Sequence, residues 1–151
     1  MLFTIRNTLT LVLLSTSSLL TNAQSTTVSV SYDENYDSSD LSLAVVACSD
    51  GSNGLIHKGY DTAGSLPPFP NIGAFYTVEN WNSPNCGKCY QITFNENGNQ
   101  IYALAVDKAG AGSVNLSKTA MNTLTDGLAE QIGRVDMEAE EVGLDKCQMP
   151  A

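Results

Sequence analysis

The sequence is poor in basic residues and in histidine, and each shortage argues against a class of function. Its 151 residues include seven Lys or Arg against sixteen Asp or Glu, which gives a net charge of −9. Such a surface repels phosphate backbones and anionic lipids, so nucleic acid and membrane partners are not expected. The single histidine, His57, has no partner at ligand spacing and is better explained as a loop residue than as a metal ligand. Neither a metal nor a cofactor is expected, whereas neutral polysaccharides face no charge barrier.

Long apolar runs are also lacking, apart from one at the amino terminus. Residues 1–23 contain one charge, Arg6, then an apolar stretch from Leu9 to Leu20 and small residues before Gln24. This pattern predicts a secretory signal peptide at 1–23, because the stretch is too short and too rich in Ser and Thr for a membrane anchor. Residues 24–151 are enough for one domain with its own core. We therefore expect a secreted, extracellular protein that can associate with cell walls.

Cysteines are few, and all four lie after residue 24: Cys48, Cys86, Cys89 and Cys147. An even number in an exported domain predicts two disulfides, although spacing alone does not choose among the three pairings. Cys86 and Cys89 form a Cys-x-x-Cys motif. The residues after it, 90–94, alternate like a strand, whereas a redox dithiol needs a helix there. A zinc site would need a second close pair, which is missing.

Alternating apolar and polar residues, together with short apolar runs such as 41–48, predict short strands separated by turns. The predicted strands cover 26–33, 41–48, 74–79, 90–94, 100–107 and 134–142. Asn95 to Asn99, which contains Asn-Gly, predicts the turn of a hairpin. One helix is predicted from Ser117, its cap, to Asp126, and 128–132 predicts a second short turn of helix. Many short strands with one or two small helices indicate a closed barrel or a sandwich.

Several sequence runs occur together and in a fixed order. They are VSVSYDENYD, ACSDGSNGLI, GYDTAGSLPPFPNIG, NWNSPNCGKCY, LAVDKAGAGSVNLS, AMNTLTDG and IGRVDMEAEEV. With the order of the cysteines, they resemble the cerato-platanin family of small secreted fungal proteins, over nearly all of residues 24–151. The resemblance implies a mainly β fold, a six-stranded double-psi β-barrel like the first domain of expansins. It also implies disulfides Cys48–Cys86 and Cys89–Cys147.

The same resemblance implies a set of roles without an established hydrolase activity. Family members are described as binding chitin oligomers, self-assembling at interfaces, loosening cellulose and provoking plant defence. The sequence departs from the usual family pattern at three places. Gly73-Ala74 replaces Gly-Gly, Lys108 replaces a His after Asp107, and Ser113 to Leu116 replaces Gly-Phe-Asn-Ile. The last two lie beside the expected groove and bear on ligand affinity more than on fold.

Asp107 is the first candidate for a functional side chain. It ends a predicted strand and enters a Gly-rich loop, 109–112, where backbone can approach a ligand. Three roles are open: fixing its loop through backbone N–H groups, binding a ligand, or catalysis. An inverting glycosidase would need a second carboxyl about 6.5–9.5 Å away. The candidate partners are Asp33, Asp37, Asp50 and Asp61.

A groove for oligosaccharides needs amide, hydroxyl and carboxylate groups, usually with an aromatic face for the sugar ring. The candidate ligand-binding residues lie in or beside the family motifs: Tyr32, Asp50, Asn53, Asn85, Gly87, Asp107 and Asn115. Asn53 and Gly87 fit turns better than ligand contacts. Trp81 is either a stacking platform or a cover over the Cys86 bridge.

Two further surface features have modest predicted roles. Asn115-Leu116-Ser117 is a glycosylation sequon, although Ser117 is also the predicted helix cap. Glu138, Glu140 and Glu141 are better explained as a solvated strand edge than as a metal site.

Three functional hypotheses remain. The leading one is a secreted, non-enzymatic protein that binds N-acetylglucosamine oligomers in fungal and plant cell walls, with expansin-like and defence-eliciting roles. The second is a weak β-glucan hydrolase that uses Asp107. The third is a surface-active structural protein that self-associates. A plant surface receptor is a further expected partner.

Overall fold

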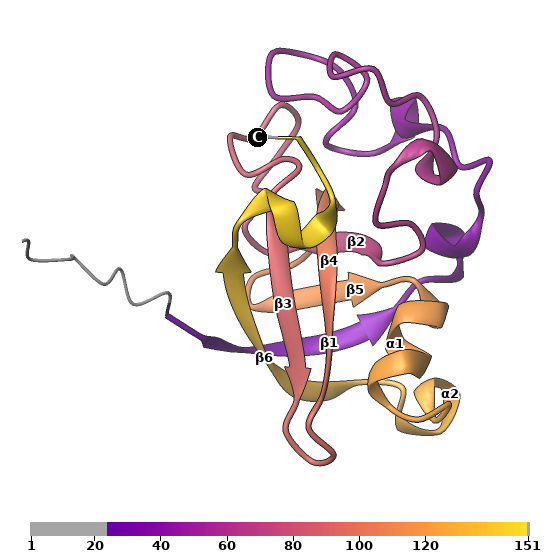
Figure 1. Ribbon diagram of the computed structural model, residues 1–151, viewed down its shortest axis with the longest axis vertical. Coiled ribbons are helices and arrows are strands. Elements are labelled where there is room, and N and C mark those ends of the chain that lie inside the picture. The colour runs from indigo at the N-terminus through magenta and orange to yellow at the C-terminus, as the bar shows by residue number, and fades with distance from the viewer. Residues whose placement is uncertain (1–23, 151) are drawn as a thin grey trace, which may run out of the picture.

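Six strands close into a barrel in the order β1-β5-β2-β4-β3-β6 (Figure 1). The computed structural model describes residues 24–150, so the predicted signal peptide at 1–23 lies outside the described residues. β1 pairs in parallel with β5, and β2 in parallel with β4, while the other neighbours are antiparallel. The predicted mainly β, six-stranded barrel is confirmed. The strands are β1 (Thr26–Tyr32), β2 (Ile72–Phe75), β3 (Cys89–Phe94), β4 (Asn99–Lys108), β5 (Ser113–Leu116) and β6 (Val135–Val142).

The barrel interior is filled by the apolar side chains that alternate along the strands. Val28 and Val30 of β1 are buried, as are Met137 and Ala139 of β6. Between β2 and β3, the ring of Phe75 stacks on that of Tyr90 with 4.7 Å between ring centroids. The period-two pattern therefore identified the inward face of these strands correctly.

Two short helices, α1 (Lys118–Leu124) and α2 (Ala129–Ile132), lie together beside the barrel (Figure 1). Ser117 caps α1 as predicted, because its Oγ accepts a hydrogen bond from the Ala120 N–H at 3.0 Å. The same hydroxyl donates to the Pro70 carbonyl at 2.6 Å, which attaches the helix to the chain before β2. Within residues 24–150, neither these helices nor any other is long and apolar enough to cross a membrane.

The predicted strand at 41–48 is wrong. Residues 43–45 form a single 3-10 turn, and Ser42 makes only an isolated bridge with Thr62. Leu43 is buried, but Val45 is 73% exposed. The segment lies over the end of the barrel, so those apolar side chains that are buried, Leu43 and Val46, are covered by loop packing and not by strand pairing.

Two other strand boundaries also differ from the prediction. The strand expected at 74–79 lies at 72–75, because the chain turns after Phe75. β5 was not predicted as a separate strand, although it fills the gap between β1 and β2. It has only four residues, too few to show a period in the sequence.

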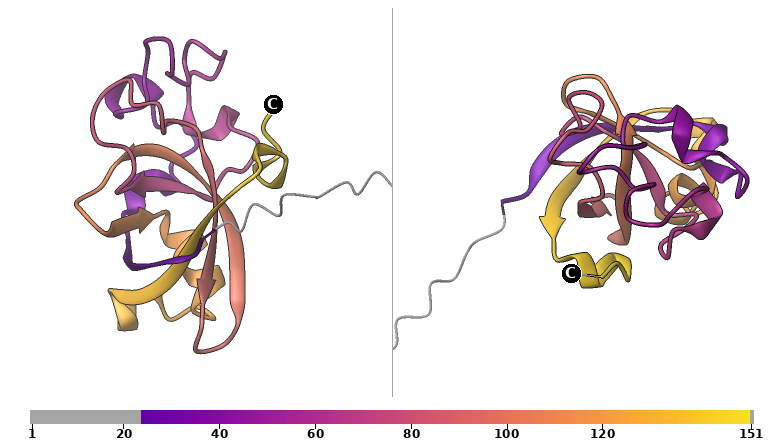
Figure 2. Two further views of the ribbon diagram at one scale, coloured as in Figure 1. Left: turned by 90° about the vertical axis from the view of Figure 1, so that its left-hand side faces the viewer. Right: turned by 90° about the horizontal axis from the view of Figure 1, so that it is seen from above.

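Two long connections gather at one end of the barrel and form most of its loop surface (Figures 1 and 2). These are residues 33–71 and 76–88. The Cys48–Cys86 disulfide joins one to the other, and Cys89–Cys147 ties the start of β3 to the final 3-10 turn. This is the pairing that the resemblance implied. The bridges span 38 and 58 residues of sequence, and chain entropy predicts about 4 kcal/mol of stabilisation for each.

Gly73 is the one glycine on which barrel closure directly depends. A Cβ at this position would lie 2.3 Å from the backbone oxygen of Asn115 on the neighbouring strand. Ala74 is 2% exposed and tolerates its side chain. In place of the usual Gly-Gly of the family, this chain has Gly73-Ala74. The alanine therefore stands at the second position, where the fold accepts a methyl group, and the first position stays glycine.

We expect Gly73→Ala to destabilise the protein by at least about 2 kcal/mol, because the strands must separate to accept the methyl group. The measurement is the free energy of unfolding from denaturant titration. Gly110→Ala is the matched control, since its Cβ would meet nothing closer than Ser113 Oγ at 4.0 Å. That variant should stay within about 0.5 kcal/mol of wild type. Equal stability of the two variants would refute the close-approach argument.

Candidate functional site

A groove of about 330 Å³ opens at the loop end of the barrel, beside the end of β4. It combines carboxylate, amide and hydroxyl groups with an apolar rim. Its walls come from three separate segments, namely the turn after β1, the 3-10 segment at 43–45 with its neighbours, and β4 itself. The lining residues are Asp33, Asn35, Tyr36, Leu41, Val45, Val46 and Asp107.

Asp107 joins the three walls of the groove. Its Oδ1 accepts the N–H groups of Ala47 and Lys108, each at 2.8 Å, and its Oδ2 accepts the hydroxyl of Tyr36 at 3.0 Å. Burial, followed by the charge of Asp107, raises the pKa of Tyr36 well above its ordinary value, so the phenol stays protonated as a donor. These contacts account for the loop-fixing role considered for Asp107.

Trp81 stands on the surface and is 57% exposed. Its indole Nε1 donates to Asp50 Oδ1 at 2.7 Å, and this hydrogen bond is the main reason why the pKa of Asp50 lies below its ordinary value. The carboxylate therefore fixes the orientation of the ring while a large part of the indole stays open to solvent. Between the two roles considered for Trp81, this exposure favours the platform.

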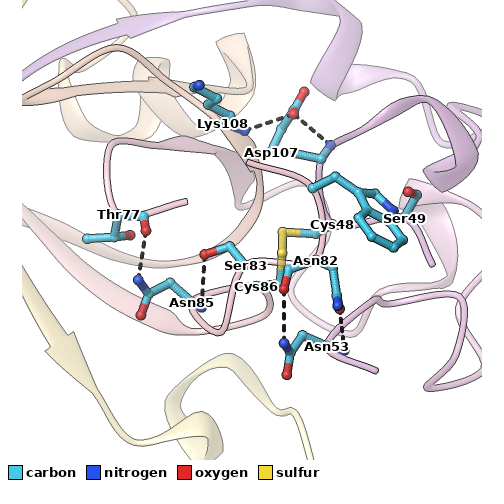
Figure 3. Close-up of a disulfide and its surroundings, with 12 residues drawn as sticks. Cys48, Ser49, Asn53, Thr77, Asn82, Ser83, Asn85, Cys86, Asp107 and Lys108 are labelled. Atoms are coloured by element: carbon cyan, nitrogen blue, oxygen red, sulfur yellow. Dashed lines mark hydrogen bonds between the residues drawn. A yellow bond between two sulfur atoms is a disulfide. The ribbon is translucent and has the colours of Figure 1, made fainter. Parts of the chain in front are cut away.

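The backbone of Ala47 connects the groove with the Trp81 loop. Its N–H donates to Asp107 at 2.8 Å, and its carbonyl accepts the N–H of Asn82 at 3.3 Å. Asn53 also donates two hydrogen bonds to Asn82: its N–H to the Asn82 side-chain oxygen at 2.9 Å, and its Nδ2 to the Asn82 carbonyl at 3.0 Å. Figure 3 shows this pair and Asp107 around the Cys48–Cys86 disulfide. Asn53 thus connects two loops, as its turn-forming prediction suggests.

Asn85 and Gly87 lie on the same loop but line no part of the groove. Asn85 Nδ2 donates to the Thr77 carbonyl at 2.7 Å, which closes the turn after β2 (Figure 3). Gly87 has a positive φ of 73° and donates its N–H to the Ala105 carbonyl at 2.8 Å. It lines a different cleft, on the side of Cys89.

Tyr32 and Asn115 also lie outside the residues that line the groove. The half-buried ring of Tyr32 has the ammonium of Lys118 at 5.6 Å from its centroid. Asn115 is part of β5, and its Oδ1 accepts a hydrogen bond from Arg134 at 3.0 Å. The hydroxyl of its sequon belongs to Ser117, which is fully buried and already engaged in the helix cap.

Sequence reasoning missed several groove residues. Tyr36 lies within a family motif, but nothing in its local pattern marks it as the partner of a distant carboxylate. Val45 and Val46 were assigned to a buried strand, and the wrong prediction at 41–48 concealed their place at the rim. Asp33 was considered only as a second carboxylate. Among residues 24–150, no group of three or more His, Cys, Asp or Glu could hold a metal ion.

The order of the strands and the position of the long loops show the class of this protein: it is a small β-barrel with two disulfides and a groove at its loop end. The family model for cerato-platanin matches residues 28–149. The heat-stable 19 kDa antigen of Coccidioides immitis is 48% identical over 121 residues, which cover 80% of this chain and 81% of that protein. The chain belongs to the cerato-platanin family, whose members are small secreted fungal proteins.

Solved structures agree with this assignment. Cerato-platanin 3 from M. perniciosa has a TM-score of 0.78 at 44% identity, over 82% of this chain and all of that one. The solution structure of cerato-platanin, described there as a fungal elicitor, has a TM-score of 0.71 at 41% identity, over 80% of this chain and 96% of that one. An expansin from Clavibacter michiganensis, at 17% identity, has a TM-score of 0.52 over 85% of this chain and 52% of that one. This likeness in fold supports the double-psi barrel.

We expect the emission of Trp81, the single tryptophan, to follow the protonation of Asp50. Because the indole lowers the pKa of Asp50 from its ordinary 3.8, the hydrogen bond is complete above pH 3.8 and is lost as the pH falls through the lower pKa of the folded state. An acid titration of fluorescence should therefore have its midpoint below 3.8. Asp50→Asn should abolish this transition and Asp61→Asn should retain it. A transition that persists unchanged in Asp50→Asn contradicts the assignment.

Proposed function

We propose that this protein is a secreted, non-enzymatic carbohydrate-binding protein of fungal and plant cell walls. Its ligand class is the N-acetylglucosamine oligomer, bound in the groove at the loop end of the barrel. The observation that carries the proposal is the groove, whose polar groups come from Asp33, Asn35 and Asp107. The backbone of Ala47 connects this groove to the loop of the exposed Trp81, whose ring is oriented by a hydrogen bond to Asp50. Polar groups beside an aromatic face are the chemistry that sugar rings require.

The charge of the site supports a neutral ligand. The groove contains two carboxylates and no cationic side chain, in a chain with a net charge of −9. An anionic sugar would be repelled there, whereas hydroxyl and acetamide groups can donate to the carboxylates. The two disulfides fit an extracellular, oxidising compartment. Expansin-like loosening of cell walls and elicitation of plant defence, directly or through a plant surface receptor, follow as roles of a wall-binding protein.

Titration with chitin tetramer tests the proposal. We expect chemical-shift changes for the amides of Asn35, Ala47 and Trp81, with weak, fast-exchange binding. Trp81→Ala should weaken the affinity about fivefold, from the loss of one stacked aromatic ring. Leu128→Ala is the matched control, because Leu128 is an exposed apolar residue, 41% accessible, that does not line the groove. Unchanged amides at millimolar ligand would overturn the proposal.

A weak β-glucan hydrolase is the second candidate, favoured by the two carboxylates, Asp33 and Asp107, that line one groove. Against it, both oxygens of Asp107 already accept hydrogen bonds, and Asp33 Oδ1 accepts the N–H of Asn35 at 2.9 Å. We expect wild-type protein to release no reducing ends from soluble β-glucan. Release that is lost in both Asp33→Asn and Asp107→Asn would establish the hydrolase in place of the binding protein.

A further inference from the structure

A second cleft, lined in part by Cys86, lies between the loop at 84–88 and the carboxyl-terminal segment. It consists of two adjoining cavities of about 370 and 250 Å³, which share Lys58, Gly87 and Leu144. We propose that this cleft binds a carboxylate-bearing sugar, such as a uronate residue of an acidic cell-wall glycan. The site does not depend on the neutral-glycan groove, since the two share no lining residue.

Lys58 carries the argument. Its ammonium group makes no ion pair or hydrogen bond with any residue between 24 and 150, whereas Lys88 and Lys118 are both paired. The Lys58 side chain is exposed, and it lies where the two cavities meet. A lysine ammonium has three donors and no acceptor, so this group is available to a carboxylate oxygen.

Gly87 provides the space beneath the ammonium. A Cβ at this position would lie 3.3 Å from Lys58 Nζ and from Leu55 Cδ2, so a side chain there would press against both. Gly87 also has a positive φ of 73°, a conformation that favours glycine. Its N–H donates a hydrogen bond to the carbonyl of Ala105 on β4. The backbone floor of the cleft is thus fixed against the barrel while the space above it stays open.

The other charged groups of the cleft cancel one another. Lys88 Nζ pairs with Glu141 Oε2 at 2.9 Å, with side chains 35% and 50% exposed. Lys58 is therefore the unbalanced charge among the lining residues, and the cleft is locally cationic on an otherwise acidic protein. Because the surrounding surface repels long polyanions, one or a few carboxylates suit the cleft better than a densely charged chain.

The remaining walls suit the ring of a sugar. Tyr60, Leu144, Met149 and Pro150 line the smaller cavity with Lys58. Their apolar and aromatic surfaces can pack against the C–H face of a pyranose while the ammonium meets its carboxylate. An inorganic anion would use only the charge, whereas a uronate would use both features of the cleft.

The test compares trigalacturonate with its methyl ester, which keeps the rings and removes the charge, in chemical-shift titrations of the protein. We expect trigalacturonate to shift the amides of Gly87, Lys88 and Leu144 and to bind two- to fivefold more tightly than the ester, as expected for one exposed charge pair. Lys58→Gln should abolish this difference. Lys146→Gln, which removes the same charge from an exposed residue lining neither cavity, should retain it.

Three results would overturn the proposal: equal binding of acid and ester by wild type, a preference that survives in Lys58→Gln, or no shift in the cleft at millimolar ligand. Shifts confined to Asn35, Ala47 and Trp81 would place the acidic sugar in the neutral groove and would equally refute the cleft. Chitin tetramer titrated separately keeps the two sites distinguishable, because its binding does not involve Lys58.

Discussion

The Cys48–Cys86 disulfide is the constraint on which the loop end of the barrel depends. Each of its half-cystines lies next to β4: the Cys48 N–H donates to the Val106 carbonyl at 3.2 Å, and the residue after Cys86 donates to Ala105 at 2.8 Å. Along the last part of β4, the loop residues Gly87 and Lys88 therefore continue the pairing of β3, the Cys48 loop bonds to the same stretch, and β2 pairs with it from Leu104 to Lys108. The second cleft is lined by Cys86 itself, and the groove by Val46, two residues before Cys48, so one crosslink contributes to the position of both.

Sequence alone predicted the elements whose burial follows from strand pairing. β1, β3 and β6 show alternation, β4 follows the Asn-Gly turn of its hairpin, and α1 has a capping serine. In each case neighbouring residues determine the pattern. Residues 41–48 failed for the opposite reason. Their apolar side chains are buried by contacts from distant loops, and Val45 is left exposed, so no local period exists to be found. The family resemblance supplied the missing strand number and the disulfide pairing.

The candidate site was only partly predictable because its residues meet through contacts distant in sequence. Asp107 was found from its position at a strand end, but its donors, Tyr36 and Ala47, come from segments 71 and 60 residues away. Asn53 and Asn85 proved to be loop connectors, whose side chains are engaged with backbone groups. The polar residues of the family motifs thus predicted that the site lies at the loop end of the barrel. They did not predict which side chains line the groove.

Asp107 illustrates why structural and binding roles need not compete. A carboxylate offers about four lone-pair positions, and three donors already occupy Asp107: two backbone N–H groups and the phenol of Tyr36. Those donors hold its orientation, so a ligand that used the remaining position would bind without any loss of side-chain freedom. One fixed acceptor suits recognition of a sugar hydroxyl. The oxygens of Asp107 are held by loop contacts rather than by a second carboxylate, so the arrangement resembles a binding group more than half of an inverting acid–base pair.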